Sequence, residues 1–204
     1  YVTNTPDVIS DTVAELTWAL ILAVAKKILE ADEFVRRGGW YESKTAWHPK
    51  MMLGTELKGK VLGIVGLGRI GTRVAKIGVL GFGMKVIYYD IVRYKEKEGI
   101  LGVEYRSSLE EVLREADIVS LHVPLTKDTY HMINEERLKL MKRTAILVNT
   151  SRGAVVDAEA LVKALREGWI AGAGLDVFEG EPIPPNHPLT AFKNVVLVPH
   201  IGSA

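Results

Sequence analysis

Six short segments of this chain are rich in valine, isoleucine and other apolar residues without polar alternation, and polar stretches with helical periodicity separate several of them. Strands without polar alternation are buried on both faces, as in a parallel sheet. Such strands, alternating with helices, predict an α/β, doubly wound domain with a mostly parallel sheet and helices on both faces. The predicted strands are Val61–Val65, Val86–Tyr89, Ile118–Val123, Ala145–Asn149, Ala171–Val177 and Val195–Val198.

Capping residues predict where several helices begin and end. A capping box satisfies free backbone N–H groups at a helix start, and Thr12–Glu15 is predicted to open the first helix, which continues to Leu29. Ser108–Glu111 is a second capping box, and Asp157 is predicted to cap a later helix. Gly81–Gly83 is interpreted as the stop of a helix before a strand.

Composition argues against several classes of protein. The 204 residues carry a net charge of +1, too little to hold a polyanion, so no nucleic-acid partner is expected. The absence of cysteine excludes a disulfide framework, and the histidine spacings offer no metal site. The most apolar stretch, Trp18–Ala25, is far shorter than the roughly 20 residues that span a bilayer. We therefore expect a cytoplasmic protein that makes no membrane contact.

Residues 40–59 have no clean periodicity and carry Trp40, Tyr41 and Trp47. Exposed aromatic side chains in this segment would indicate a surface for a partner. Packing of the same side chains onto their own domain is the alternative interpretation.

The first predicted strand runs directly into a glycine-rich turn that precedes a predicted helix. The residues of this turn are Gly66, Leu67, Gly68, Arg69, Ile70 and Gly71. In a dinucleotide-binding turn, the three glycines permit the tight turn, the approach of a pyrophosphate and the close packing of helix on strand. The phosphates then meet free N–H groups and the positive end of the helix dipole. The turn therefore predicts a dinucleotide site in a Rossmann fold.

The second predicted strand ends in Asp90, 19 residues after Gly71. A carboxylate at this position accepts hydrogen bonds from the adenine-ribose hydroxyls. Since it would repel the 2′-phosphate of NADP, the predicted cofactor is NAD. Arg93 leaves an alternative open, because its guanidinium would favour that phosphate if it turned toward the site. A solvent-facing Arg93 is the favoured interpretation.

Ligands of open α/β sheets bind beyond the carboxyl ends of the strands, where three reactive residue types occur here. Arg152 follows one predicted strand, Glu179 and Glu181 follow the next, and His200 follows the last. A guanidinium binds a substrate carboxylate and polarises the carbonyl. A histidine exchanges the hydroxyl proton, and a carboxylate beside it fixes its tautomer and favours its protonated form. The set predicts hydride transfer between NAD(H) and a hydroxyl or carbonyl carbon.

Other interpretations of these residues stay open at this point. Arg152 also fits a surface ion pair, and spacing alone does not separate Glu179 from Glu181. His122 follows a strand and would lie near the cofactor if its side chain turned inward, although a structural role is favoured. The remaining histidines are interpreted as structural: His48, His131 and His187.

The chain resembles the D-isomer-specific 2-hydroxyacid dehydrogenases along essentially its whole length, and among them it looks most similar to glyoxylate/hydroxypyruvate reductases. Five motifs in the family's order carry the resemblance: Gly66–Gly71, Val123–Thr126, Asn149–Gly153, Gly174–Pro182 and Pro199–Gly202.

The resemblance implies a catalytic set of Arg152, Glu181 and His200, because the family's acid precedes a proline. It also implies cofactor contacts beyond the glycine turn and Asp90. These lie at Pro124, Thr150, Asp176 and Gly202.

The resemblance further implies a homodimer, since family members dimerise through this domain. Residues 1–59 would supply a helix and an arm on which Trp47 reaches the partner's site. Family members also have a substrate domain, so we expect residues 1–204 to be the dinucleotide-binding domain alone. The alternatives to an enzyme acting on glyoxylate or hydroxypyruvate are a 3-phosphoglycerate or phosphite dehydrogenase and an NAD-sensing, corepressor-like module.

Overall fold

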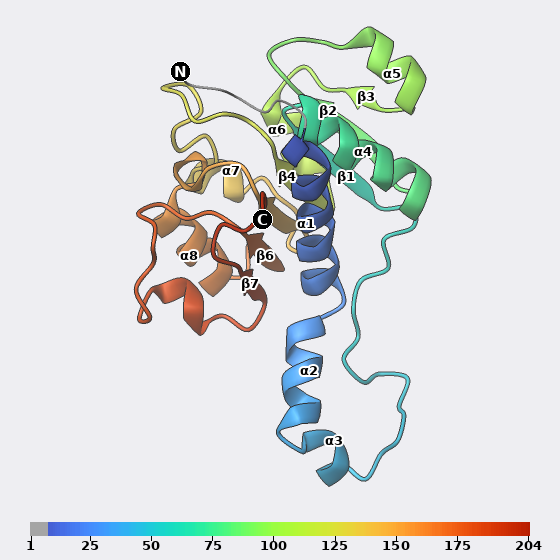
Figure 1. The fold of residues 1–204 in the computed structure, drawn as a ribbon, viewed down its shortest axis with the longest axis vertical. Helices are drawn as coiled ribbons and strands as arrows, with labels where there is room; N and C mark the ends of the chain where they lie inside the picture. The colour runs from blue at the N-terminus through green and yellow to red at the C-terminus, as the bar shows by residue number, and fades with distance from the viewer. Residues whose placement is uncertain (1–7) are drawn as a thin grey trace.

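The computed structural model describes residues 8–204, and its seven strands form one sheet (Figure 1). The strand order is β3-β2-β1-β4-β5-β6-β7, and every neighbouring pair is parallel. The doubly wound α/β prediction is confirmed. The strands are β1 (Val61–Val65), β2 (Lys85–Tyr89), β3 (Glu104–Tyr105), β4 (Ile118–Leu121), β5 (Ile146–Asn149), β6 (Gly172–Leu175) and β7 (Val195–Leu197).

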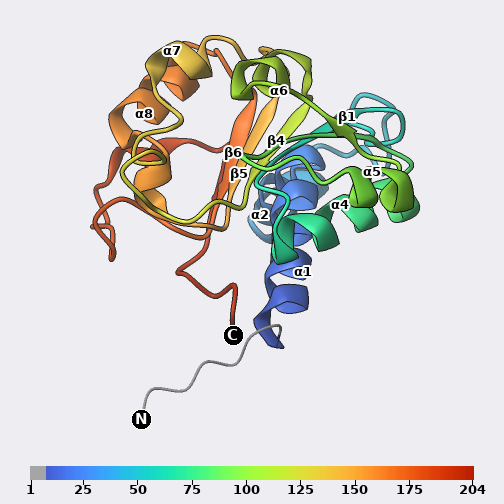
Figure 2. The same ribbon diagram turned by 90° about the horizontal axis from the view of Figure 1, so that it is seen from above.

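Helices cover both faces of the sheet (Figure 2). One face carries α1 (Val8–Ala25) and α4 (Arg69–Phe82), and α5 (Lys95–Leu101) lies beside α4. The other face carries α6 (Leu109–Glu115), α7 (Glu135–Leu138) and α8 (Ala158–Arg166). Apart from β3, the strands are largely buried between the two layers, which explains why they lack a polar alternation.

The first helix differs from the prediction at both ends. Because α1 already includes Val8, Thr12 lies inside the helix, and the prediction that Thr12–Glu15 opens it was wrong. The buried face of α1 extends back to Ser10, so packing against the domain and not the local motif decides where this helix runs. Lys27, with a left-handed φ of 55°, separates α1 from α2 (Ile28–Arg36).

The predicted N-caps Ser108 and Asp157 and the helix stop at Gly83 are confirmed, although the Glu111 carboxylate of the predicted capping box accepts from Ser107. The Ser108 hydroxyl accepts from the Glu111 N–H at 3.3 Å, and the Asp157 carboxylate accepts from the Ala160 N–H at 3.0 Å. Helix α4 ends at Gly83, whose φ of 59° lies in the left-handed region that glycine adopts at helix ends.

Residues 28–53 form an arm that projects away from the sheet (Figure 1). It begins with α2 and α3 (Gly39–Glu42), in which no residue is buried. Tyr41 is 90% exposed and Trp47 is 77% exposed. The arm's aromatic side chains therefore do not pack into their own domain. Within residues 8–204, no helix is long and apolar enough to cross a membrane.

Candidate cofactor and catalytic site

The glycine-rich turn joins β1 to α4, and each glycine meets a different steric demand. Gly66 has a φ of 94°, which only glycine adopts without strain. A Cβ at Gly71 would collide with the Gly66 carbonyl, so this glycine lets α4 pack against the turn. Gly68 is exposed, and apart from its chain neighbours no described atom lies within 4 Å of a Cβ built there. That open side is where a pyrophosphate would approach the first turn of α4, opened by Arg69 and Ile70.

Asp90 directly follows β2 beside this turn, and its carboxylate accepts from the Leu67 N–H at 2.8 Å. Arg93 is turned to another partner: its Nε and Nη2 each lie 2.9 Å from the Glu98 carboxylate. Its guanidinium also lies 5.3 Å from the centre of the Tyr105 ring. The acid that follows β2 is therefore held against the glycine turn, and the neighbouring arginine is paired with Glu98.

The turn that carries Arg152 follows β5 and is built by Asn149. The Asn149 amide donates to the Arg152 carbonyl at 2.9 Å, and its oxygen accepts from the Ser151 N–H at 3.0 Å. Thr150 is buried, and its hydroxyl lies 2.9 Å from the hydroxyl of Thr17 on α1. Thr17 also donates to the Val13 carbonyl, so Thr150 is the donor between the two hydroxyls.

Asp176 follows β6 and holds the loop that carries the predicted histidine. Its buried carboxylate accepts from the Ile201 N–H at 2.7 Å and from the Gly202 N–H at 3.0 Å. Its carbonyl accepts from the His200 N–H at 2.9 Å. His200 has a φ of 54°, an uncommon conformation for a side-chain-bearing residue, and these hydrogen bonds stabilise it.

Glu181 is the acid that the structure places beside His200. Its Oε2 lies 2.8 Å from His200 Nδ1, and its Oε1 accepts from the Phe178 N–H at 2.7 Å. Partial burial raises the pKa of Glu181. The two hydrogen bonds and the charge of Arg152 lower this pKa by more than burial raises it, so it falls below its ordinary value. Glu181 therefore stays ionised at neutral pH as a partner for the imidazole of His200. The other acid of this loop, Glu179, contacts His131 instead.

A cavity of about 420 Å³ opens beside this pair. Apart from the two polar side chains, its walls are largely apolar. Its lining residues are Phe178, Glu181, Pro182, Ile183, Leu197, Val198, Pro199 and His200.

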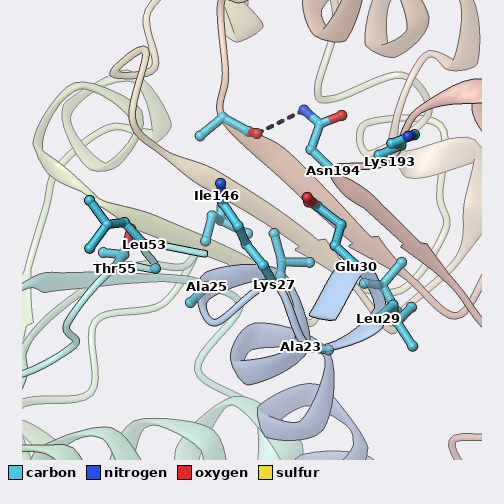
Figure 3. A pocket seen from close by; sticks show the side chains of 14 residues that line it. Ala23, Ala25, Lys27, Leu29, Glu30, Leu53, Thr55, Ile146, Lys193 and Asn194 are labelled. Carbon is cyan, nitrogen blue, oxygen red and sulfur yellow. Dashed lines mark hydrogen bonds between the residues drawn. The ribbon is translucent and has the colours of Figure 1, made fainter. Parts of the chain in front are cut away.

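A smaller cavity of about 100 Å³ lies at the opposite edge of the sheet, where β5 and β7 begin (Figure 3). Lys27, Glu30 and Lys193 are among its lining residues, and the Asn194 amide donates to the Ala171 carbonyl there. None of the predicted site residues lines this cavity, so it is separate from the candidate site.

The other predicted residues are placed as follows. Pro124 lies in the exposed turn after β4, where its carbonyl accepts from the Thr129 hydroxyl at 2.6 Å. His122 lies behind the glycine turn and its Nε2 is 2.8 Å from the Ser120 hydroxyl. Burial lowers the pKa of His122 to about 3, so this imidazole is neutral. In the described part of the chain, no three acidic or histidine side chains are grouped to hold a metal ion.

Two residues that support the site were not predicted from the sequence. Thr17 lies in an apolar helix, with no local signal that its hydroxyl reaches Thr150. Lys97 lies in a charged helix, and its ammonium donates to the Leu67 carbonyl at 2.7 Å and to the Thr72 hydroxyl at 3.1 Å. Both contacts join segments far apart in the sequence.

The parallel sheet, the glycine turn and Asp90 define a dinucleotide-binding domain of the Rossmann class. The family model described as "D-isomer specific 2-hydroxyacid dehydrogenase, NAD binding domain" matches residues 18–202. The chain belongs to this family, of which it forms the NAD-binding domain.

Individual relatives agree with the family match. The chain is 66% identical over all 204 residues to a glyoxylate reductase of Aeropyrum pernix, of which it covers 60%. Among solved structures, 98% of the chain superposes on the TT0316 protein from Thermus thermophilus with a TM-score of 0.91, 52% identity and 61% of that chain covered. An NAD-complexed D-isomer-specific 2-hydroxyacid dehydrogenase of Lactobacillus delbrueckii gives a TM-score of 0.82 and 37% identity, with 98% of this chain and 62% of that chain covered. The chain thus spans about three fifths of the length of these relatives.

Substitution of two glycines should separate cofactor binding from folding. Gly68→Ala adds a methyl group on the open side of the turn, so we expect unchanged stability but NADH affinity reduced about tenfold or more, a loss of at least about 1.4 kcal/mol. Gly71→Ala forces a methyl group into the Gly66 carbonyl, so we expect a lower unfolding midpoint in urea. Urea unfolding and calorimetric NADH titration measure the two effects. A Gly68→Ala chain that binds NADH as tightly as the parent would contradict this assignment of the turn.

Proposed function

We propose that this chain supplies the cofactor site and the catalytic residues of an NADH-dependent enzyme that reduces a small 2-oxo acid such as glyoxylate or hydroxypyruvate. The observation that carries the proposal is the 2.8 Å contact of His200 with Glu181, at the same sheet edge as the glycine turn and Arg152. Relatives that are 58–66% identical bear the name glyoxylate reductase, which supports this substrate class over a phosphorylated acid or phosphite. The substrate domain would lie outside this chain.

We assign each catalytic side chain a role in the proposed reaction. Bound NADH supplies the hydride. Arg152 binds the substrate carboxylate and polarises the neighbouring carbonyl. Because Nδ1 of His200 is directed at Glu181, Nε2 is the atom that faces the substrate and donates a proton to its oxygen. Glu181 stabilises the imidazolium before transfer and holds the ring in the required orientation.

We propose cofactor-lining roles for the other residues of the site. Gly66–Gly71 would hold the pyrophosphate, with Asp90 on the ribose and Pro124 lining the adenosine side. Thr150, Asp176 and Gly202 lie at the carboxyl ends of β5 to β7, so we place the nicotinamide there. The hydroxyl of Thr150 donates to Thr17, so it would offer an acceptor to the nicotinamide carboxamide.

Asp90 should make the chain prefer NADH to NADPH, because its carboxylate beside the glycine turn would repel a 2′-phosphate on the adenine ribose. We expect calorimetric titration to give NADH an affinity at least about tenfold higher, or about 1.4 kcal/mol. Asp90→Ala should lower the ratio of the NADH affinity to the NADPH affinity. The control Glu167→Ala, at an exposed position directly after α8, should leave this ratio unchanged. Tighter NADPH binding by the parent would assign the phosphate to Arg93 and overturn the NAD assignment.

The catalytic roles can be tested in a chimera in which these residues replace the matching segment of the Aeropyrum pernix relative. We expect His200→Gln and Arg152→Lys to lower kcat/KM for glyoxylate by about 10² to 10⁴, because proton transfer and bidentate binding are lost. Arg166→Lys, at the end of α8, is the matched control and should retain activity. A chimera that binds NADH without reducing glyoxylate would favour the NAD-sensing, corepressor-like alternative.

We also propose that the protein forms a homodimer through the arm, with Trp47 directed toward the partner's site. We propose a cytoplasmic location for this dimer. The exposed aromatic side chains of the arm support the homodimer, since a monomer rarely exposes several of them together. Light scattering should give the parent a dimer mass, and the double variant Tyr41→Lys, Trp47→Lys should shift it toward a monomer. Ile100→Lys, equally exposed on α5, is the control. A monomeric parent would contradict the proposal.

A further inference from the structure

Residues 178–181, which we name the acidic loop, contain two glutamates, and a histidine side chain contacts each of them. Glu181 contacts His200, as described above. Glu179, two residues earlier, contacts His131, whose Nε2 lies 3.0 Å from Oε1 and 3.1 Å from Oε2. Two His–Glu pairs therefore attach one short loop to two different parts of the domain.

We propose that His131 is a positioning residue: it holds Glu179 and thereby fixes the acidic loop that presents Glu181 to His200. The proposal rests on the proposed function, because the orientation of His200 matters in that reaction. Gly180 separates the two acids, is exposed and has a φ of 76°. Since glycine leaves the backbone many conformations, an anchor on the Glu179 side restricts where Glu181 can lie.

The backbone of His131 is attached to the turn that carries Arg152. The His131 N–H donates to the Ala154 carbonyl at 2.8 Å. A Cβ at Gly153 would collide with the Phe178 carbonyl, so this turn and the acidic loop are in contact through their main chains. His131 thus joins the two segments that supply the guanidinium and the carboxylate of the proposed reaction.

The charged groups around His131 favour this contact. Glu179 faces Nε2, and the Asp157 carboxylate lies 3.8 Å from Nδ1. The Tyr130 ring stacks on the imidazole with 4.0 Å between ring centres, and its hydroxyl lies 3.4 Å from Glu179. The side chains of His131 and Glu179 are 29% and 33% exposed, so solvent screens the pair and its share of global stability is small. The effect of the pair is therefore local.

The tautomer of His200 reports this local effect without any cofactor. An ionised carboxylate only accepts hydrogen bonds, so a neutral His200 must carry its proton on Nδ1 to bind Glu181. Long-range ¹H–¹⁵N spectra of the labelled chain at alkaline pH distinguish this tautomer from the Nε2–H form. We expect the parent to show the Nδ1–H tautomer for His200, and its absence would overturn the proposal.

Three variants then test the role of His131. His131→Ala should shift His200 toward the Nε2–H tautomer, and Glu179→Ala should do the same from the other side of the pair. His131→Gln, whose amide N–H replaces the Nε2–H donor, should restore the parental spectrum. A parental His200 spectrum in either alanine variant would overturn the proposal, and Glu179→Ala decides it if His131→Ala does not fold.

NADH titration separates this proposal from the proposed function. We expect all three variants to bind NADH within about twofold of the parent, since His131 does not line the cofactor turn. Failure of the parent to bind NADH would contradict the proposed function. The His200 spectra would still decide whether His131 positions the acidic loop. In the chimera, His131→Ala should lower kcat about tenfold with little change in KM, and His131→Gln should recover it. An unchanged kcat in His131→Ala would overturn the positioning role.

Discussion

The parallel alignment of all seven strands is the constraint on which the rest of this structure depends. Parallel strands direct every carboxyl end to one edge of the sheet, so loops far apart in the sequence meet there. Asp90, Arg152, Asp176 and His200 come from four such ends. The helices on both faces make this arrangement possible. After each strand the chain must cross back to the opposite edge of the sheet before the next parallel strand can begin, and helices form most of these crossover connections.

Much of the fold was predictable because its signals are local. Largely apolar strands and a strand–glycine turn–helix succession depend on residues that are neighbours in the chain, and all six predicted strands are present. The two-residue strand β3 was not predicted, because Glu104 and Tyr105 form no apolar run and gain their order by pairing with β2. Thr12–Glu15 failed as a helix start because a capping motif inside a buried helix has the same letters as one at its end.

In the candidate site too, the residues with a local sequence signal were predicted, and the contacts between distant parts of the chain were not. The residue types at the strand ends indicated a guanidinium, an acid and an imidazole, and the structure brings Glu181 and His200 together. Spacing alone left Glu179 and Glu181 equivalent, since the choice depends on which histidine folds against each acid. The contacts of Thr17 with Thr150 and of Lys97 with the glycine turn join residues more than 20 positions apart, and no local pattern encodes them.

The main-chain contact between Gly153 and Phe178 has a consequence for how specificity can evolve. Because no side chain lies at this contact, the close approach of the Arg152 turn to the acidic loop depends on Gly153, and a substitution there disturbs both segments. The wall formed by Ile183 and Leu197 is under no such restriction. Under the proposed function, substitutions in that wall would therefore change the substrate step by step, while the catalytic side chains beside it would be kept.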